Sequence, residues 1–119
     1  MVSPDGLLIL CSKLDGTYLT QRVSGEAAQT VPGLTVDDEV IRWSADNRSL
    51  YVYRPASVPW KVERLDVASG GRVLVHEVFP ADRTGALWAF QAGLTDDHTL
   101  LMIGFERITS QLFVVEGAR

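Results

Sequence analysis

Cysteine is nearly absent from this chain of 119 residues, in which Cys11 is the only one. A lone cysteine can form neither a disulfide within the chain nor a cysteine-based zinc site. Because Cys11 follows an apolar run, we expect its thiol to be buried and inert. A buried thiol is compatible with a reducing or an oxidising compartment, so cysteine usage leaves the localisation open.

Long apolar runs and an excess of basic residues are also missing. No stretch approaches the roughly 20 apolar residues that span a bilayer, and the first residues lack a signal-peptide pattern. The formal net charge is −4, and residues of both signs are interspersed. This distribution disfavours a nucleic-acid surface and a polybasic membrane anchor, so we expect neither nucleic acid nor direct membrane contact.

Catalytic motifs are absent as well: there is no Gly-rich phosphate loop, no kinase catalytic motif and no Gly-x-Ser-x-Gly elbow. His76 and His98 have no carboxylate beside them at metal-ligand spacing, and we expect both to be solvated. The acidic run Asp37-Asp38-Glu39 lacks the alternating ligands and glycine of a calcium loop, so we interpret it as a solvated connection. The sequence therefore predicts no catalytic, cofactor-binding or metal-binding residues.

What the chain does have is period-two alternation, with turn signals at intervals of about 8–12 residues. Asp15-Gly16 and Ser24-Gly25 are typical of tight hairpin turns. No helical spacing of apolar residues persists over about ten residues. We therefore predict an all-β chain with strands at 7–11, 17–23, 27–31, 40–43, 49–54, 60–67, 72–79, 86–94, 100–105 and 110–116. The apolar pattern within 60–67 slips near Arg64, which suggests a bulge.

A polar turn that leads into an apolar strand occurs three times. Its copies are Ser3-Pro-Asp-Gly6, Ser44-Ala-Asp-Asn47 and Thr95-Asp-Asp-His98. The aspartates Asp5, Asp46 and Asp97 are separated by 41 and 51 residues. Four short antiparallel strands in each 40–50 residues or so are the signature of a β-propeller blade.

The repeat predicts a single partial propeller domain over residues 1–119, with units at approximately 1–33, 34–79 and 80–119. Only the middle unit would have all four strands, so the chain would hold about two and a half blades of a longer protein. Neighbouring blades cover each other's faces. The outer faces of the end units would then expose apolar surface, and we expect self-association through these faces or through open strand edges.

These motifs resemble a known family. Ser3-Pro-Asp-Gly6, and Trp43-Ser-Ala-Asp46 followed by Leu50-Tyr-Val-Tyr53, are similar to the repeat of TolB-type, WD-repeat-like bacterial propellers. Asp66-Val-Ala-Ser-Gly-Gly71 resembles the hairpin between their outer strands. The Pro-Asp-Gly motif is intact only in the first unit, but the other two units keep turn-forming residues.

A narrower resemblance concerns the end of the propeller in some bacterial receptor-like serine/threonine kinases. It is carried by Val31-Pro-Gly33, Ile41–Tyr53, Phe79-Pro-Ala-Asp82 and Leu112-Phe-Val-Val-Glu-Gly117. The resemblance implies a sensor or interaction domain on the extracytoplasmic, periplasmic side of the membrane. The kinase domain of such a parent chain would lie outside this sequence.

Aromatic and basic residues near the loops are the candidates for recognition. Trp60 follows a proline-rich loop and is the best candidate for an exposed aromatic anchor, because such residues dominate interface energies. Arg54 and Arg83 lie at or near neighbouring loops and could complete one recognition rim. Trp43 is expected in the core, and Trp88 either in the core or along a central channel.

The sequence therefore favours a non-catalytic protein-interaction or sensing module of a bacterial signalling protein. A piece of a propeller hydrolase or peptidase, and a structural domain of unknown role, remain open alternatives. The ligand or protein partner is not indicated by any motif.

Overall fold

The computed structural model describes residues 1–79, 86–95 and 101–108, and for residues 86–91, 102 and 104–108 it describes the backbone alone. This part of the chain forms strands and turns without any helix, which confirms the predicted all-β class. The strands are β1 Leu8–Ser12, β2 Tyr18–Arg22, β3 Gln29–Thr30, β4 Glu39–Trp43, β5 Ser49–Tyr53, β6 Trp60–Asp66, β7 Arg72–Val78, β8 Ala86–Leu94 and β9 Leu101–Ile108. The strand predicted at 110–116 lies outside the described residues.

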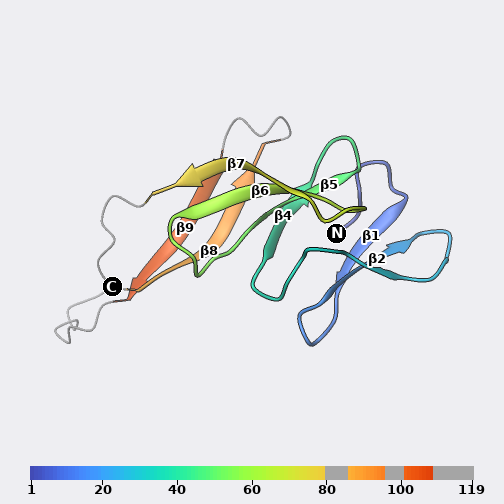
Figure 1. Cartoon of the computed structure of the whole chain (residues 1–119), viewed down its shortest axis with the longest axis horizontal. Helices are drawn as coiled ribbons and strands as arrows, with labels where there is room; N and C mark the ends of the chain where they lie inside the picture. The colour runs from blue at the N-terminus through green and yellow to red at the C-terminus, as the bar shows by residue number, and fades with distance from the viewer. Residues whose placement is uncertain (80–85, 96–100, 109–119) are drawn as a thin grey trace.

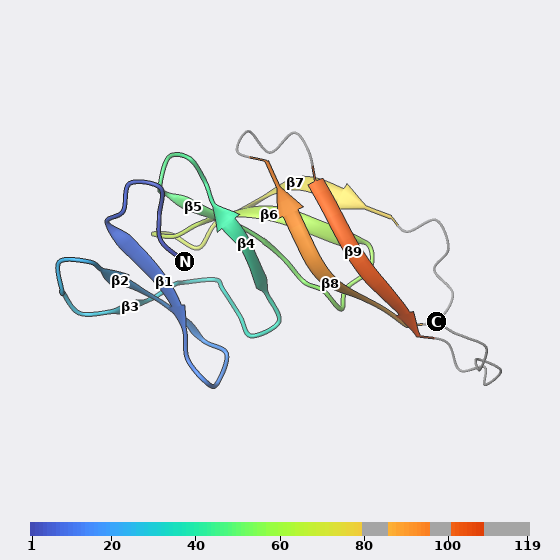
Figure 2. The same ribbon diagram turned by 180° about the vertical axis from the view of Figure 1, so that it is seen from behind.

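The strands form three antiparallel sheets, each joining strands that are consecutive along the chain (Figures 1 and 2). The first sheet has the order β1-β2-β3, the middle sheet β4-β5-β6-β7 and the third sheet β8-β9. The middle sheet lies between the other two (Figure 2). Short turns join neighbouring strands of the first and middle sheets, as the spacing of Gly, Asp and Asn predicts.

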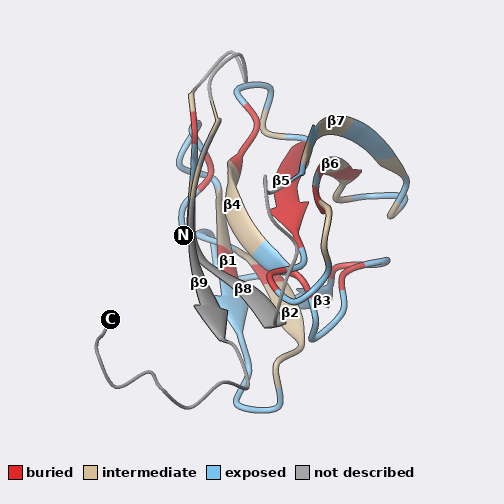
Figure 3. Ribbon diagram, turned by 90° about the vertical axis from the view of Figure 1, so that its left-hand side faces the viewer, coloured by how far each residue is buried: buried red, intermediate tan, exposed pale blue. Residues whose placement is uncertain are grey.

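The middle sheet is covered on both faces, and β5 shows this most clearly because all its residues are buried (Figure 3). Successive side chains of a strand point to opposite faces. Leu50 and Val52 therefore pack toward the first sheet, whereas Tyr51 and Tyr53 pack toward the third. A strand buried on both sides explains why residues 50–53 are apolar without interruption.

The same geometry explains the interrupted apolar pattern of β6, for which the sequence suggests a bulge near Arg64. Trp60 and Val62 belong to the cluster beside the third sheet, and Leu65 belongs to the cluster beside the first. The apolar side chains thus change from one face of β6 to the other between Val62 and Leu65. The side chains of β6 themselves alternate regularly. The bulge lies on the partner strand, because the pairing shifts after Val62 and skips Val75 of β7.

Among the described residues, another sheet covers only one of the two faces of the first sheet. Leu8 and Leu10 of β1 pack against the middle sheet, whereas Cys11 is exposed on the opposite side. The prediction that Cys11 is buried is therefore wrong. The apolar run correctly indicated a strand, but a strand in a sheet with one covered face buries only alternate residues.

Two of the three aspartate turns have the same hydrogen bonds. In the first, the Ser3 hydroxyl donates to the Asp5 carboxylate at 2.6 Å, and the Leu7 amide donates to the same oxygen at 3.0 Å. In the second, the Ser44 hydroxyl and the Arg48 amide donate to Asp46 in the same way. The third turn, around Asp97, lies almost entirely outside the described residues.

Candidate functional site

The predicted recognition rim does not form around Trp60. The side chain of Trp60 is fully buried beside Tyr51 and Tyr53, and its indole N–H donates to the carbonyl of Pro55 at 2.8 Å. The expectation of an exposed aromatic anchor is therefore wrong for this residue. Trp60 begins a strand of the doubly covered sheet, so the proline-rich loop before it closes over the indole ring.

Arg54 does lie at the surface, in a different environment. Its side chain is about half exposed, and its Nε donates to Oδ1 of Asp38 at 3.2 Å. It lines a cavity of about 380 Å³ together with Asp37, Glu39 and the loop 55–57. Arg83 lies outside the described residues. Of the two rim residues that the structure describes, one thus faces the core and the other is tied to an acidic loop.

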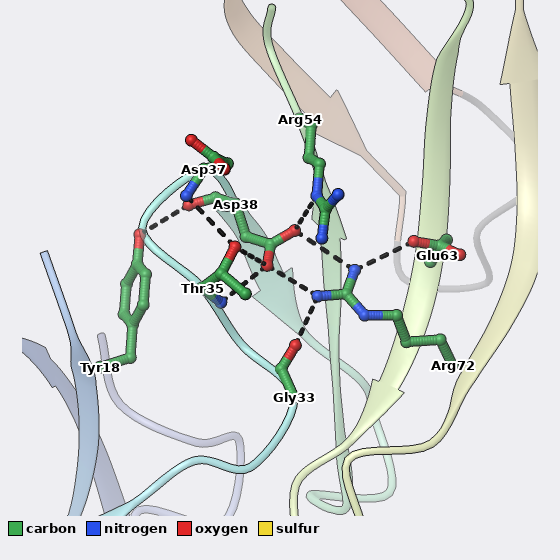
Figure 4. Close-up of polar contacts among 8 residues, drawn as sticks. All are labelled: Tyr18, Gly33, Thr35, Asp37, Asp38, Arg54, Glu63 and Arg72. Carbon is green, nitrogen blue, oxygen red and sulfur yellow. Dashed lines mark hydrogen bonds and ion pairs between the residues drawn. The ribbon is translucent and has the colours of Figure 1, made fainter. Parts of the chain in front are cut away.

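The centre of that loop is Asp38, whose polar contacts Figure 4 shows. Asp38 is only 2% exposed. Arg72 donates from Nη2 to Oδ2 at 2.7 Å and from Nη1 to Oδ1 at 3.2 Å, forming a bidentate pair. The Thr35 amide donates to Oδ2 at 2.8 Å. We call Asp38 with Thr35, Arg54 and Arg72 the Asp38 clasp.

The Asp38 clasp corrects the interpretation of Asp37-Asp38-Glu39 as a solvated run. Asp37 and Glu39 are exposed, but the carboxylate between them turns inward toward two arginines. Runs of acids usually face solvent because burying a charge is costly unless it is paired. The pairing partners are supplied by the ends of β5 and β7, which a local pattern does not reveal.

One local signal could have identified Asp38. Thr35 precedes it by three residues, and this spacing lets the threonine hydroxyl and amide reach back to the carboxylate. The Asp38 amide in turn donates to the Thr35 carbonyl at 3.1 Å. A Thr-x-x-Asp spacing is typical of such reciprocal local bonding, although the arginine partners would still have been missed.

The electrostatics of the clasp keep both partners charged. Burial alone would raise the pKa of Asp38, but hydrogen bonds from Arg72, the Thr35 amide and Arg54 outweigh it and lower the pKa below its usual value. Burial likewise opposes the charge of Arg72, whereas Asp38 and Glu63 raise its pKa overall. The Asp38 carboxylate is therefore ionised at neutral pH, with both oxygens already occupied by donors.

These contacts connect the first sheet to the middle one. Tyr18 of β2 donates its hydroxyl to the Asp38 carbonyl at 3.2 Å, and Arg72 donates to the Gly33 carbonyl at 2.7 Å. Beside them the backbones of Gly33 and Gly70 approach so closely that a Cβ on Gly33 would lie 2.8 Å from the Gly70 oxygen. The Asp38 clasp thus holds the connection 31–38 against the middle sheet, which is a structural role.

Groups suited to metal binding are not clustered in the described part of the chain. There, no three residues among His, Cys, Asp and Glu are placed to hold a metal ion. His76 is half-buried on β7, and His98 lies outside the described residues. Trp43 lies in the core, as predicted, whereas the side chain of Trp88 is not described.

The described residues include no helix long and apolar enough to span a bilayer.

Comparisons with models of protein families, with curated proteins and with solved structures found no match to this chain. Its function is therefore proposed from its own residues and geometry.

Proposed function

We propose that the chain is a non-catalytic interaction or sensing module, a piece of a TolB-type β-propeller in a larger bacterial signalling protein. The observation that carries this proposal is the open apolar face of the first sheet. The residues of this face correspond to residues that are buried in the middle sheet. The face is therefore suited to contact with another protein surface.

The correspondence follows from an offset of 41 residues. The bridge between Val2 and Ile9 occupies the position of the pair Trp43–Leu50, and the aspartate turns between them have the same hydrogen bonds. The matched positions are Val2 with Trp43, Ile9 with Leu50 and Cys11 with Val52. In the middle sheet these residues are buried against the first sheet.

In the first sheet the corresponding residues are at least partly accessible. Val2 is 56% exposed, Cys11 is exposed and Ile9 is half-buried. Leu7 and Val23, at the end of the same face, are each 57% exposed. Contiguous apolar surface of this kind marks interaction sites. Because the face carries no charged side chain at these positions, two copies can pack together without like-charge repulsion.

Light scattering after size-exclusion chromatography tests the interaction role, with the chain at micromolar concentration. We expect a mass above that of the monomer, and a shift toward the monomer for Cys11→Glu, which puts a charge in the middle of the open face. Leu14→Glu is the matched control because Leu14 lies fully exposed in a turn, outside the sheets. A strictly monomeric wild-type chain, or an equal effect of both variants, would argue against this surface.

The sensing role is tested by the sequence that flanks this segment in its gene. An upstream kinase domain and membrane span would support a receptor-like signalling protein. A downstream hydrolase domain would overturn this proposal in favour of a propeller enzyme.

A further inference from the structure

A larger cavity, of about 890 Å³, lies between the first and middle sheets. Its walls come from β2 and β3 on one side, and from the turn after β4 and the hairpin after β6 on the other. This volume is in the range of sites that hold small organic molecules. Its residues take no part in the Asp38 clasp or in the open face of the first sheet, so the cavity is a separate feature.

Three hydrogen-bond donors in the wall of this cavity lack partners among the described residues. The Arg48 guanidinium forms no ion pair or hydrogen bond there. The Asn47 side-chain oxygen accepts from the Asp5 amide at 2.8 Å, which leaves its NH2 group available. The Thr20 hydroxyl has no partner either, although Thr20 is only 8% exposed. No fully buried side-chain oxygen or nitrogen of the described residues lacks a partner, so the Thr20 hydroxyl reaches the cavity surface, where water or a ligand can satisfy it.

The acidic residues in the wall are already engaged by their own loops. Asp66 accepts from the backbone amides of Ala68 and Ser69 at 2.9 and 3.0 Å. Glu26 accepts from the Ser24 hydroxyl at 2.6 Å and lies 3.8 Å from the Arg22 guanidinium. In the described part of the chain, these contacts use one oxygen of each carboxylate and leave Oδ2 of Asp66 and Oε2 of Glu26 as open acceptors. The open donors of Arg48, Asn47 and Thr20 outnumber these two acceptors, which favours a ligand that carries acceptors.

Charge and apolar surface narrow the class of ligand. Two arginines, Arg22 and Arg48, are balanced by Asp66 and Glu26. The carboxylates would repel a multiply charged anion such as phosphate more than a singly charged one. Leu8 and Val67 add half-buried apolar surface to opposite walls.

We propose that this cavity is a binding site for a small monocarboxylate with an apolar body. The carboxylate lies against the Arg48 guanidinium, whose planar fork matches it bidentately. The Asn47 amide and the Thr20 hydroxyl supply further donors, and the body of the ligand packs between Leu8 and Val67. The site does not depend on the proposed signalling function.

The test is a titration of the whole chain, followed by two-dimensional NMR at constant ionic strength. The probes are phenylacetate, its neutral analogue phenylacetamide, and inorganic phosphate. We expect phenylacetate to shift the amide signals of Thr20, Asn47 and Arg48, and to bind at least about fivefold more tightly than either of the other probes. Shifts spread over other surfaces, or equal responses to phenylacetate and phosphate, would overturn the proposal.

Two variants sharpen the assignment. Arg48→Gln should weaken phenylacetate binding by about tenfold, the usual range for a lost charge-assisted hydrogen bond. Lys13→Gln removes the same charge from an exposed turn outside the cavity and should leave binding unchanged. Unchanged binding in Arg48→Gln, or an equal loss in Lys13→Gln, would contradict the site.

Thr20→Val provides a readout that a purely structural role would not give. The substitution keeps the shape of the side chain and removes the unpaired hydroxyl, so the free protein should be at least as stable in thermal unfolding. Phenylacetate binding should nevertheless fall about threefold. A less stable variant, or one that binds as the wild type does, would show that the hydroxyl is not a donor awaiting a ligand.

Discussion

The first and middle sheets use the same turn and the same strand pattern, yet they differ in burial. Leu50 is fully buried in the middle sheet, whereas Ile9, at the matching position of the first sheet, is half-buried. The two residues are chemically similar and pair in the same way with the strand that precedes the turn. The difference shows that the neighbouring sheet, and not the strand itself, decides whether a residue belongs to the core.

Truncating these two matched residues should give the largest contrast in stability. Leu50→Ala removes a side chain from a packed cluster and should lower the free energy of unfolding by about 4 kcal/mol. Ile9→Ala should cost about 1 kcal/mol, because part of the side chain already contacts solvent. Urea unfolding of both variants at equal protein concentration measures the contrast. Similar losses would mean that the open face is covered in solution, for instance by a second copy.

The clasp between the two sheets should give the next largest effect. Asp38→Ala leaves Arg72, which is 18% exposed, with the Glu63 carboxylate as its one remaining ion-pair partner among the described residues, and should cost about 3 kcal/mol. The effect stays in the lower part of the usual range because Arg54 can turn toward water. Asp37→Ala removes an exposed neighbouring carboxylate and should change the stability by less than about 0.5 kcal/mol. Equal effects in urea unfolding would show that the clasp contributes little.

The pH dependence of stability checks the same carboxylate independently. Because folding lowers the pKa of Asp38, its contribution is fully present above the pKa of the unfolded chain, about 3.9. The contribution is lost as the pH falls through the lower, folded value. Asp38→Asn should therefore show a shallower loss of stability than the wild type below about pH 4. An unchanged slope would assign the acid sensitivity to the carboxylates of the turns.

Glycine substitutions at two turns should give the smallest contrast. Gly33 and Gly25 both have positive φ, at 78° and 100°. A Cβ on Gly33 would also collide with the Gly70 backbone, whereas nothing lies within 4 Å of Gly25. We expect Gly33→Ala to cost about 2 kcal/mol and Gly25→Ala about 1 kcal/mol in thermal unfolding. Equal costs would mean that the connection 31–38 moves to relieve the contact.

Much of the local structure was predictable from the sequence. Period-two alternation predicted eight of the described strands to within a few residues, and the short β3 lies inside a longer predicted strand. The Asp15-Gly16 and Ser24-Gly25 pairs predicted tight turns, and both glycines have positive φ in the structure. These features are local because hydrogen bonds and backbone sterics within a few residues determine them.

The candidate sites were less predictable. Trp60, Asp38 and Cys11 were each assigned to the wrong environment, and in each case the error concerned burial rather than secondary structure. An aromatic residue beside a loop, an aspartate within an acidic run and a cysteine after an apolar run each fit two environments. The partners that decide between them lie on other sheets or are separated by many residues.

The sequence alone determined that this chain forms short antiparallel strands joined by tight turns, because those features depend on neighbouring residues. Only the tertiary structure decided which faces are covered, that Asp38 pairs with Arg72 34 residues away, and that a cavity lined by unpaired donors opens between two sheets. The physical reason is that hydrophobic burial and ion pairing depend on what packs across a sheet. The sequence of a strand shows which of its residues are apolar, but it does not show which other element will pack on each face.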